Sequence, residues 1–133
     1  MTAALRDYEE VVGPQVIEEI RVVAGHVSHK SLQNINSTAV GGGVAEILTR
    51  MMPLLHELEV KASWDVIKGN EAFFNVTKAF HNALHGSREK ITDKMLEVFR
   101  EITAMNLKSM NLNGDVIMVH DPQPVGMILR KRE

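Results

Sequence analysis

Three consecutive glycines, Gly41, Gly42 and Gly43, stand between a segment that predicts a short strand and a periodic apolar segment that predicts a helix. Glycine lets the backbone turn sharply and lets a ligand come close to it. The unpaired N–H groups at a helix start, with the positive end of the helix dipole, favour a bound anion or a sugar hydroxyl. Two interpretations are open for these residues: a ligand-binding loop and a tight strand-to-helix turn.

Two further groups of polar residues could do chemistry. His120 ends an apolar run and is followed by the proline-flanked turn Asp121-Pro122-Gln123-Pro124. Taken alone, a histidine after a buried strand is most simply a structural residue that is hydrogen-bonded to a backbone carbonyl. His81 and Asn82 lie on a predicted helix between apolar neighbours. For this pair, a half-buried structural role and a contact with a ligand are equally good interpretations.

Helices and strands alternate along the chain, after a polar lead-in over residues 1 to 12. The apolar periodicity and the capping residues Pro14, Asn70 and Thr92 place the helices. They are predicted from Pro14 to near Ser28, after the glycines to Leu58, from Glu71 to about Leu84, from Thr92 through the apolar stripe Met95–Met105, and from Val125 to Leu129. Strands are predicted at Leu32–Asn36, Ala62–Ile67 and Asp115–His120. We expect the Met95–Met105 stripe to belong to the core.

This alternation predicts an α/β fold of the Rossmann-like type, with a small parallel sheet of about three strands between layers of helices. We expect Leu32–Asn36 to be the middle strand. Ligands of such sheets bind outside the carboxyl ends of the strands. The glycine loop and the His120–Pro124 turn would then flank one crevice. The apolar run Asp115–His120 predicts a strand that is buried on both faces.

The two outer strands of such a sheet have unpaired edges, which favour pairing with another chain unless something covers them. We therefore expect the chain to be a piece of a larger sheet or to form a homo-oligomer through its open edges.

The composition is that of an ordinary globular domain. The 133 residues are 44% hydrophobic and 24% charged, with a net charge of −2 and no cysteine. This length favours one domain. The charge gives no sign of nucleic-acid binding, and the absence of cysteine excludes disulfides and thiolate metal sites. No apolar run is long enough to cross a bilayer, so neither a membrane nor a secretory route is expected and a cytoplasmic location is the default.

Four stretches together resemble one family. They are Asn36–Glu46, Trp64–Gly69, Phe73–Leu84 and Val119–Pro124. Their order and spacing resemble those of retaining glycosyltransferases with two Rossmann-like domains, the GT-B architecture. Within that class they are similar to the trehalose glycosyltransferring synthases and the related retaining trehalose phosphorylases. The resemblance covers nearly the whole chain from residue 30 onward.

The resemblance implies a role for each motif. His120 would face the glucosyl group as the catalytic residue. The residues implied to bind substrate come from three of the stretches: Gly41, Gly42, Gly43, His81, Asn82, Asp121 and Gln123. The glycines would lie under the donor phosphates and the transferred sugar. One position departs from the family, because His85 stands where the family usually carries glutamine.

Families of this kind transfer glucose with retention of configuration and need no metal or other cofactor. The substrates implied are a nucleotide sugar with glucose, or trehalose in the reverse direction. The departing phosphate assists the incoming hydroxyl, so the protein mainly positions groups and stabilises charge. The histidines show no spacing typical of a metal site. Whether the leaving group is a nucleotide or phosphate stays open between synthase and phosphorylase.

In this family, residues 1–133 would form part of the N-terminal, acceptor-side domain, and the donor-binding C-terminal domain would be absent. Two functions are therefore predicted. The chain is the N-terminal part of a glucosyltransferase, inactive alone, or it is a non-catalytic truncated relative that serves as a sugar-binding or self-associating module. Because of that absence, the sequence does not decide whether the chain is an enzyme by itself.

Overall fold

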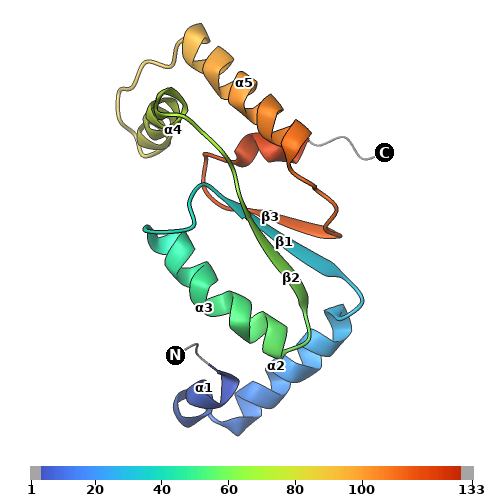
Figure 1. The fold of residues 1–133 in the computed structure, drawn as a ribbon. Helices are drawn as coiled ribbons and strands as arrows, with labels where there is room; N and C mark the ends of the chain where they lie inside the picture. Colours follow the sequence, from blue (N-terminus) through green and yellow to red (C-terminus); the bar gives the residue numbers. More distant parts are fainter. Residues whose placement is uncertain (1–3, 130–133) are drawn as a thin grey trace.

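The fold is an α/β arrangement, seen in a computed structural model that describes residues 4–129. In chain order the elements are α1 (Leu5–Val12), α2 (Pro14–Val27), β1 (Ser31–Asn36), α3 (Gly43–Glu57), β2 (Lys61–Val66), α4 (Glu71–Leu84), α5 (Asp93–Ser109), β3 (Val116–Val119) and the 3₁₀ helix η1 (Val125–Leu129). Helices α1 and α2 lie at one end of the molecule and α4 and α5 at the other, with the sheet and α3 between them (Figure 1). Within residues 4–129, no helix combines the length and the apolar character needed to span a membrane.

The sheet is parallel and has the strand order β2-β1-β3. Strand β1 pairs with β2 from Ser31 opposite Lys61, and with β3 from Leu32 opposite Val116. The predicted fold class and the central position of β1 are both confirmed. Because all three strands run in the same direction, the loops that follow them emerge at one edge of the sheet.

The helix starts follow the capping residues that the sequence indicates. The Asn70 side chain accepts a hydrogen bond from the Phe73 N–H at 2.9 Å, and the Thr92 hydroxyl accepts one from the Met95 N–H at 3.3 Å. Pro14 occupies the first turn of α2, where its missing N–H has no cost. These local interactions explain why the starts of α2, α4 and α5 are predicted within a residue.

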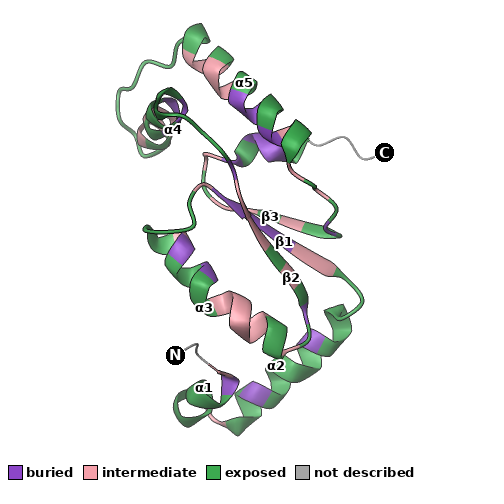
Figure 2. Cartoon of the chain, in the orientation of Figure 1, coloured by how far each residue is buried: buried purple, intermediate pink, exposed green. Residues whose placement is uncertain are grey.

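One face of the sheet carries the main hydrophobic cluster. Its buried members come from β1, the end of β2, α4, α5 and η1: Ile35, Ile67, Phe73, Ile102 and Met127. The rings of Phe73 and Phe99 stack with 5.8 Å between their centroids, joining α4 to α5. Figure 2 shows the buried part of α5 on the half of the helix nearest the sheet. Met105, which the sequence placed in the core stripe, is instead 59% exposed, because it lies on the side of α5 that points away from this cluster.

The opposite face of the sheet is covered unevenly. Helix α3 packs beside β2, and Ala45 and Leu48 of this helix are buried. No comparable helix covers β3 on this side within the described residues, and Val116 and Met118 remain 47% and 44% exposed. The prediction that this strand is buried on both faces is therefore wrong. The apolar run is continuous, but one of its two faces has no covering element in the described part of the chain.

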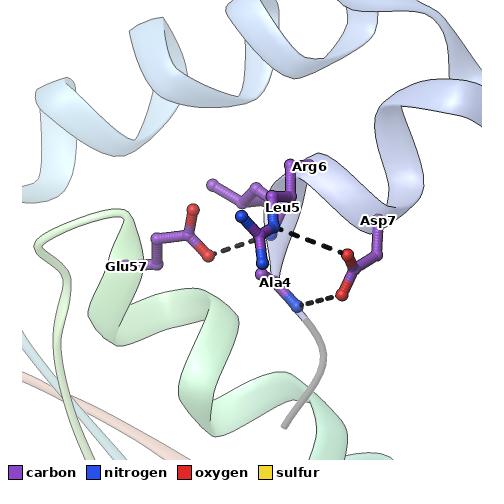
Figure 3. A network of polar contacts seen from close by, with 5 residues as sticks. All are labelled: Ala4, Leu5, Arg6, Asp7 and Glu57. Atoms are coloured by element: carbon purple, nitrogen blue, oxygen red, sulfur yellow. Dashed lines mark hydrogen bonds and ion pairs between the residues drawn. The ribbon is translucent and has the colours of Figure 1, made fainter. Parts of the chain in front are cut away.

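The N-terminal segment contains a short helix that the sequence reading missed. Figure 3 shows how α1 is held: Glu57, near the end of α3, accepts a hydrogen bond from the Leu5 N–H at 2.9 Å, and Asp7 accepts one from the Ala4 N–H at 2.9 Å. Both carboxylates lie at the positive end of the helix dipole, where they stabilise it. The exposed ion pair between Arg6 and Asp7, 3.8 Å apart, adds little. A tertiary contact from α3 thus satisfies an N–H group at the start of α1, a helix that the polar character of residues 1 to 12 did not predict.

The first residue of β1 is tied to the residue before β3. Asp115 accepts hydrogen bonds of 2.8 Å from both the N–H and the hydroxyl of Ser31. The backbone bond from Ser31 lowers the pKa of Asp115 below its ordinary value of 3.8, with smaller contributions from the Ser31 hydroxyl and the charges of Lys30 and His29. The carboxylate is exposed, and its slight desolvation acts in the opposite direction, so the lowering of the pKa comes from these partners.

The hydrogen bonds between Ser31 and Asp115 predict that the stability of the fold depends on pH. Because the folded pKa of Asp115 is depressed, its stabilising effect is present above the ordinary value and is lost as the pH falls through the folded pKa. In an NMR titration, the Asp115 carboxyl should have its midpoint below 3.8. Ser31→Ala should keep part of the shift, because the backbone bond remains. A midpoint at or above 3.8 in the parent chain would contradict the hydrogen bonds from Ser31 to Asp115.

A second prediction concerns Asn106, which is 3% exposed and closes the end of β2. Its amide accepts from the Lys68 N–H at 2.8 Å and donates to the Lys68 carbonyl at 2.7 Å. Asn106→Ala should lower the free energy of unfolding by about 1–3 kcal/mol, because buried backbone groups lose their partners. Urea denaturation measures this loss. Lys108→Ala, at an exposed position of the same helix, is the control and should change stability by less than about 0.5 kcal/mol.

Candidate substrate-binding site

The glycine loop leads from β1 directly into α3. Gly41 and Gly42 have φ angles of +76° and +83°, which side chains disfavour, and Gly43 is the first residue of the helix. Gly42 is the N-cap residue and provides no side-chain cap. The first N–H groups of α3 are therefore not occupied by a capping side chain, and they can donate to a ligand.

Polar side chains hold the start of this loop in shape. The Asn36 amide donates to the Thr38 carbonyl at 2.7 Å and accepts from the Trp64 indole N–H at 2.8 Å. The Thr38 hydroxyl in turn donates to the Val40 carbonyl at 2.7 Å. Asn36 is 1% exposed, so its amide links the loop to β2 from inside the protein. The loop is thus positioned before any ligand arrives.

His120 is fixed twice to β1. Its backbone N–H donates to the Ile35 carbonyl at 2.9 Å, which extends the pairing of β3 with β1. Its ring Nε2 lies 3.0 Å from Oδ1 of Asn34. The Asn34 amide also contacts Met52 of α3, with Nδ2 3.9 Å from the sulfur, so Asn34 points toward the face that α3 covers. His120 therefore lies on the same face as α3, at the strand end next to the glycine loop.

The turn after His120 bends sharply. Asp121 is exposed and has a φ of +67°, an uncommon angle for a residue other than glycine. Pro124 is buried, and its carbonyl accepts from the Met127 N–H at 2.8 Å, which starts η1. The Gln123 side chain is half-buried, and within residues 4–129 its Oε1 atom is buried without a hydrogen-bond partner. An exposed carboxylate and a buried amide oxygen without a described partner thus lie within three residues of His120 in the sequence.

His81 and Asn82 have their polar partners elsewhere. The exposed His81 ring stacks on His85, with 4.2 Å between the centroids, and His85 Nδ1 lies 2.8 Å from the His81 carbonyl. Asn82 is half-buried and donates to Glu89 at 3.2 Å. In the described part of the chain, no hydrogen bond links this pair to His120. Their predicted contact with an acceptor sugar is untested by this geometry.

A cavity of about 1070 Å³ extends along α3 from the glycine loop toward α1. Gly41 and Gly43 lie at one end, Tyr8 of α1 lines it as well, and Glu46 and Arg50 contribute charged groups. Its lining does not include His120. Tyr8 was not predicted as a lining residue because no helix was expected over residues 1 to 12. The described residues contain no cluster of three or more histidine and carboxylate side chains that could hold a metal ion.

The sequence reading also missed Asn34 as the partner of His120. A signal was nevertheless present, because Gln33, Asn34 and Asn36 are polar residues in the strand expected to be central. Buried polar groups require partners, so amides at these positions predict specific hydrogen bonds. The identity of each partner depends on which strands and helices lie beside β1, and this is set by the tertiary structure.

The fold and the position of these residues define the class: a Rossmann-like α/β domain with a glycine loop and a histidine at the ends of neighbouring parallel strands. Comparison with known proteins gives the family. Residues 34–133 match the family model described as "Trehalose synthase, N-terminal domain". The chain belongs to this family.

Individual relatives agree with the family match. The trehalose synthase of Thermococcus litoralis is 43% identical over 93% of this chain and 31% of its own length. That of Rubrobacter xylanophilus is 38% identical over 91% of this chain and 30% of its own length. The trehalose phosphorylase of Pleurotus pulmonarius is 27% identical over 93% of this chain and 18% of its own length. The chain thus spans about a third of the length of the trehalose synthases that it matches.

The two glycines at the start of α3 allow a matched test of the loop. At Gly42, the φ of +83° and ψ of 151° suit glycine alone, so Gly42→Ala should cost about 1–3 kcal/mol locally and change the loop. Gly43 has no positive φ, and neither site has an atom within 4 Å of an added Cβ. Gly43→Ala is therefore the control for backbone strain and should change stability by less than about 0.5 kcal/mol, while calorimetry with glucose or phosphate should show weaker binding by Gly42→Ala. If Gly42→Ala binds as well as the parent chain, the loop is not the site.

Proposed function

We propose that the chain is the N-terminal, acceptor-side part of a retaining glucosyltransferase that forms or cleaves trehalose from nucleotide-activated glucose and glucose. The observation that carries the proposal is the placement of His120 on the α3 face, at the strand end next to the glycine loop. Both groups lie inside the matched part of the chain, residues 34–133. Membership of the trehalose synthase family supports the choice of substrate.

The chemistry of the site suits positioning of an uncharged sugar. The N–H groups at the start of α3 can donate to a sugar oxygen or a phosphate, and the His120 ring can bond to a hydroxyl of the transferred glucose. The exposed carboxylate of Asp121 adds an acceptor for hydroxyls of the acceptor sugar, and Gln123, whose Oε1 atom is buried, supports the turn. Such groups act by orientation and by stabilising charge in the transition state, with no covalent step on the protein.

The donor is proposed to bind partly outside this chain. The trehalose synthases among the relatives are about three times as long as the region that matches, so most of their sequence lies beyond it. We assign residues 1–133 to part of the acceptor-side domain. We propose that the donor nucleotide is bound by a second domain. Both trehalose synthases and trehalose phosphorylases are among the relatives. We therefore propose that the second domain determines whether the leaving group is a nucleotide or phosphate.

The proposal is tested by adding a nucleoside diphosphate glucose and glucose to the chain and measuring trehalose, with parallel calorimetric titrations of glucose, trehalose and the nucleotide. We expect no turnover by this chain and weak binding of glucose or trehalose. His120→Gln should weaken sugar binding by about 0.5–1.5 kcal/mol, up to about tenfold, because glutamine has no nitrogen in the place of Nδ1 and a hydrogen bond to the sugar is lost. His26→Gln, at an exposed position on α2, should have no effect.

Trehalose formation by the chain alone would contradict the assignment of the donor to a second domain. Absence of binding to either sugar would contradict the acceptor-side role and favour the second candidate function.

That second candidate is self-association without catalysis, and the uncovered face of β3 favours it. Val116 and Met118 are exposed there on an edge strand, beside an apolar cavity of about 340 Å³ between α2 and the sheet. Exposed apolar side chains on an unpaired strand edge favour pairing with another chain. We propose that two copies associate through this edge as a homo-oligomer when nothing else covers it.

Sedimentation equilibrium tests the association. Met118→Lys should shift the chain toward monomer, because a charge on an edge strand opposes pairing. Leu84→Lys is the control, since Leu84 is 75% exposed at the end of α4, away from β3. A parent chain that stays monomeric at all concentrations, or equal shifts in both variants, would contradict association through β3.

A further inference from the structure

The Asn34 side chain is fully buried in the middle of the sheet and is bonded on both sides. Its exposed fraction is 0%. The Nδ2 atom lies 3.3 Å from the Ser63 carbonyl of β2, and the Oδ1 atom lies 3.0 Å from Nε2 of His120. The amide thus spans β1 from one neighbouring strand to the other. A buried amide in this position must use both of its ends.

The carbonyl of Ser63 determines which way this amide faces. A carbonyl oxygen can only accept a hydrogen bond, so the amide end toward Ser63 must be the NH₂ group. The oxygen of Asn34 then faces His120. An amide oxygen also only accepts, so the bond at 3.0 Å requires a proton on Nε2 of His120.

A neutral imidazole carries one N–H, so a proton on Nε2 leaves a lone pair on Nδ1. Within residues 4–129, Nδ1 of His120 has no hydrogen-bond partner. The ring is half-buried, and the backbone N–H of His120 is held by Ile35. Among the described residues, the ring therefore has a fixed position, one nitrogen in a hydrogen bond and one nitrogen left as an acceptor.

We propose that Asn34 is a positioning residue that holds His120 in the tautomer with the proton on Nε2, so that the Nδ1 lone pair accepts a hydrogen bond from a sugar hydroxyl. The use of Nδ1 rests on the proposed sugar-binding function, whereas the tautomer does not. A histidine in the other tautomer would present an N–H to the same hydroxyl. Asn34 thereby decides whether this position accepts or donates.

NMR of the chain labelled with ¹⁵N at histidine tests the tautomer at mildly alkaline pH, where imidazoles are neutral. His120→Gln identifies the His120 signals by their disappearance. We expect Nδ1 at the chemical shift of an unprotonated nitrogen and Nε2 at that of a protonated one. The proton on Nε2 should give a sharp resonance, because a hydrogen bond to a buried oxygen protects it from exchange. A protonated Nδ1 in the parent chain would overturn the proposal.

Two variants separate positioning from folding. Asn34→Leu should abolish the protected Nε2–H resonance, while Asn34→Asp should keep it because a carboxylate also accepts. The Trp64 indole N–H, bonded to Asn36 at 2.8 Å, reports in the same sample that the sheet is intact. Persistence of the His120 resonance in a folded Asn34→Leu would overturn the role of Asn34. If Asn34→Leu does not fold, the parent chain and Asn34→Asp still test the positioning role of Asn34. Loss of the Nε2–H resonance in a folded Asn34→Asp would contradict that role.

Adding trehalose then tests the use of Nδ1. We expect the Nδ1 resonance to shift on saturation and Nε2 to keep its proton. A change at Nε2 in place of Nδ1 would overturn the proposed acceptor role. No response at either nitrogen would overturn sugar binding by His120, while the tautomer and its dependence on Asn34 would stand on the preceding measurements.

Discussion

The structure depends on the buried amides of β1, which is the only strand of the described sheet with a neighbour on each side. Gln33, Asn34 and Asn36 are at most 3% exposed. Gln33 donates to Asp65 and to the Asn111 carbonyl, while the other two bond to β2, β3 and the glycine loop. Each amide would be costly to bury unless its partner were in place. The central strand therefore specifies its neighbours by hydrogen bonds as well as by packing.

Alternation along β1 separates stability from the site. Ile35 points into the cluster with Phe73 and Ile102, whereas Asn34 and Asn36 point toward the α3 face. The first face is closed by helices and aromatic contacts. The second carries His120 and the glycine loop, and it remains open over β3. Substitutions aimed at the proposed site can thus lie on one face of a strand whose other face packs into the hydrophobic cluster.

Features that arise from local physics could be predicted from the sequence. The caps at Asn70 and Thr92, the alternation of helices and strands and the central place of β1 follow from propensity, periodicity and the rule of right-handed crossovers. Features that need a distant partner could not. The first turn of helix α1 is bonded to Glu57 of α3, and the exposure of Met118 depends on the absence of a covering helix within the described residues. An apolar strand looks the same in sequence whether one or two of its faces are covered.

The sequence by itself determined the kind of fold and the family of this protein, because glycine, proline and capping residues act on their immediate neighbours and the four motifs keep a characteristic order. It also determined that a histidine ends a strand beside a glycine loop. Only the tertiary structure decided which side chain meets that histidine. The amide of Asn34 is 86 residues away in the chain, and it meets the ring because parallel pairing places β3 next to β1. A hydrogen bond across such a separation follows from register, which no local pattern specifies.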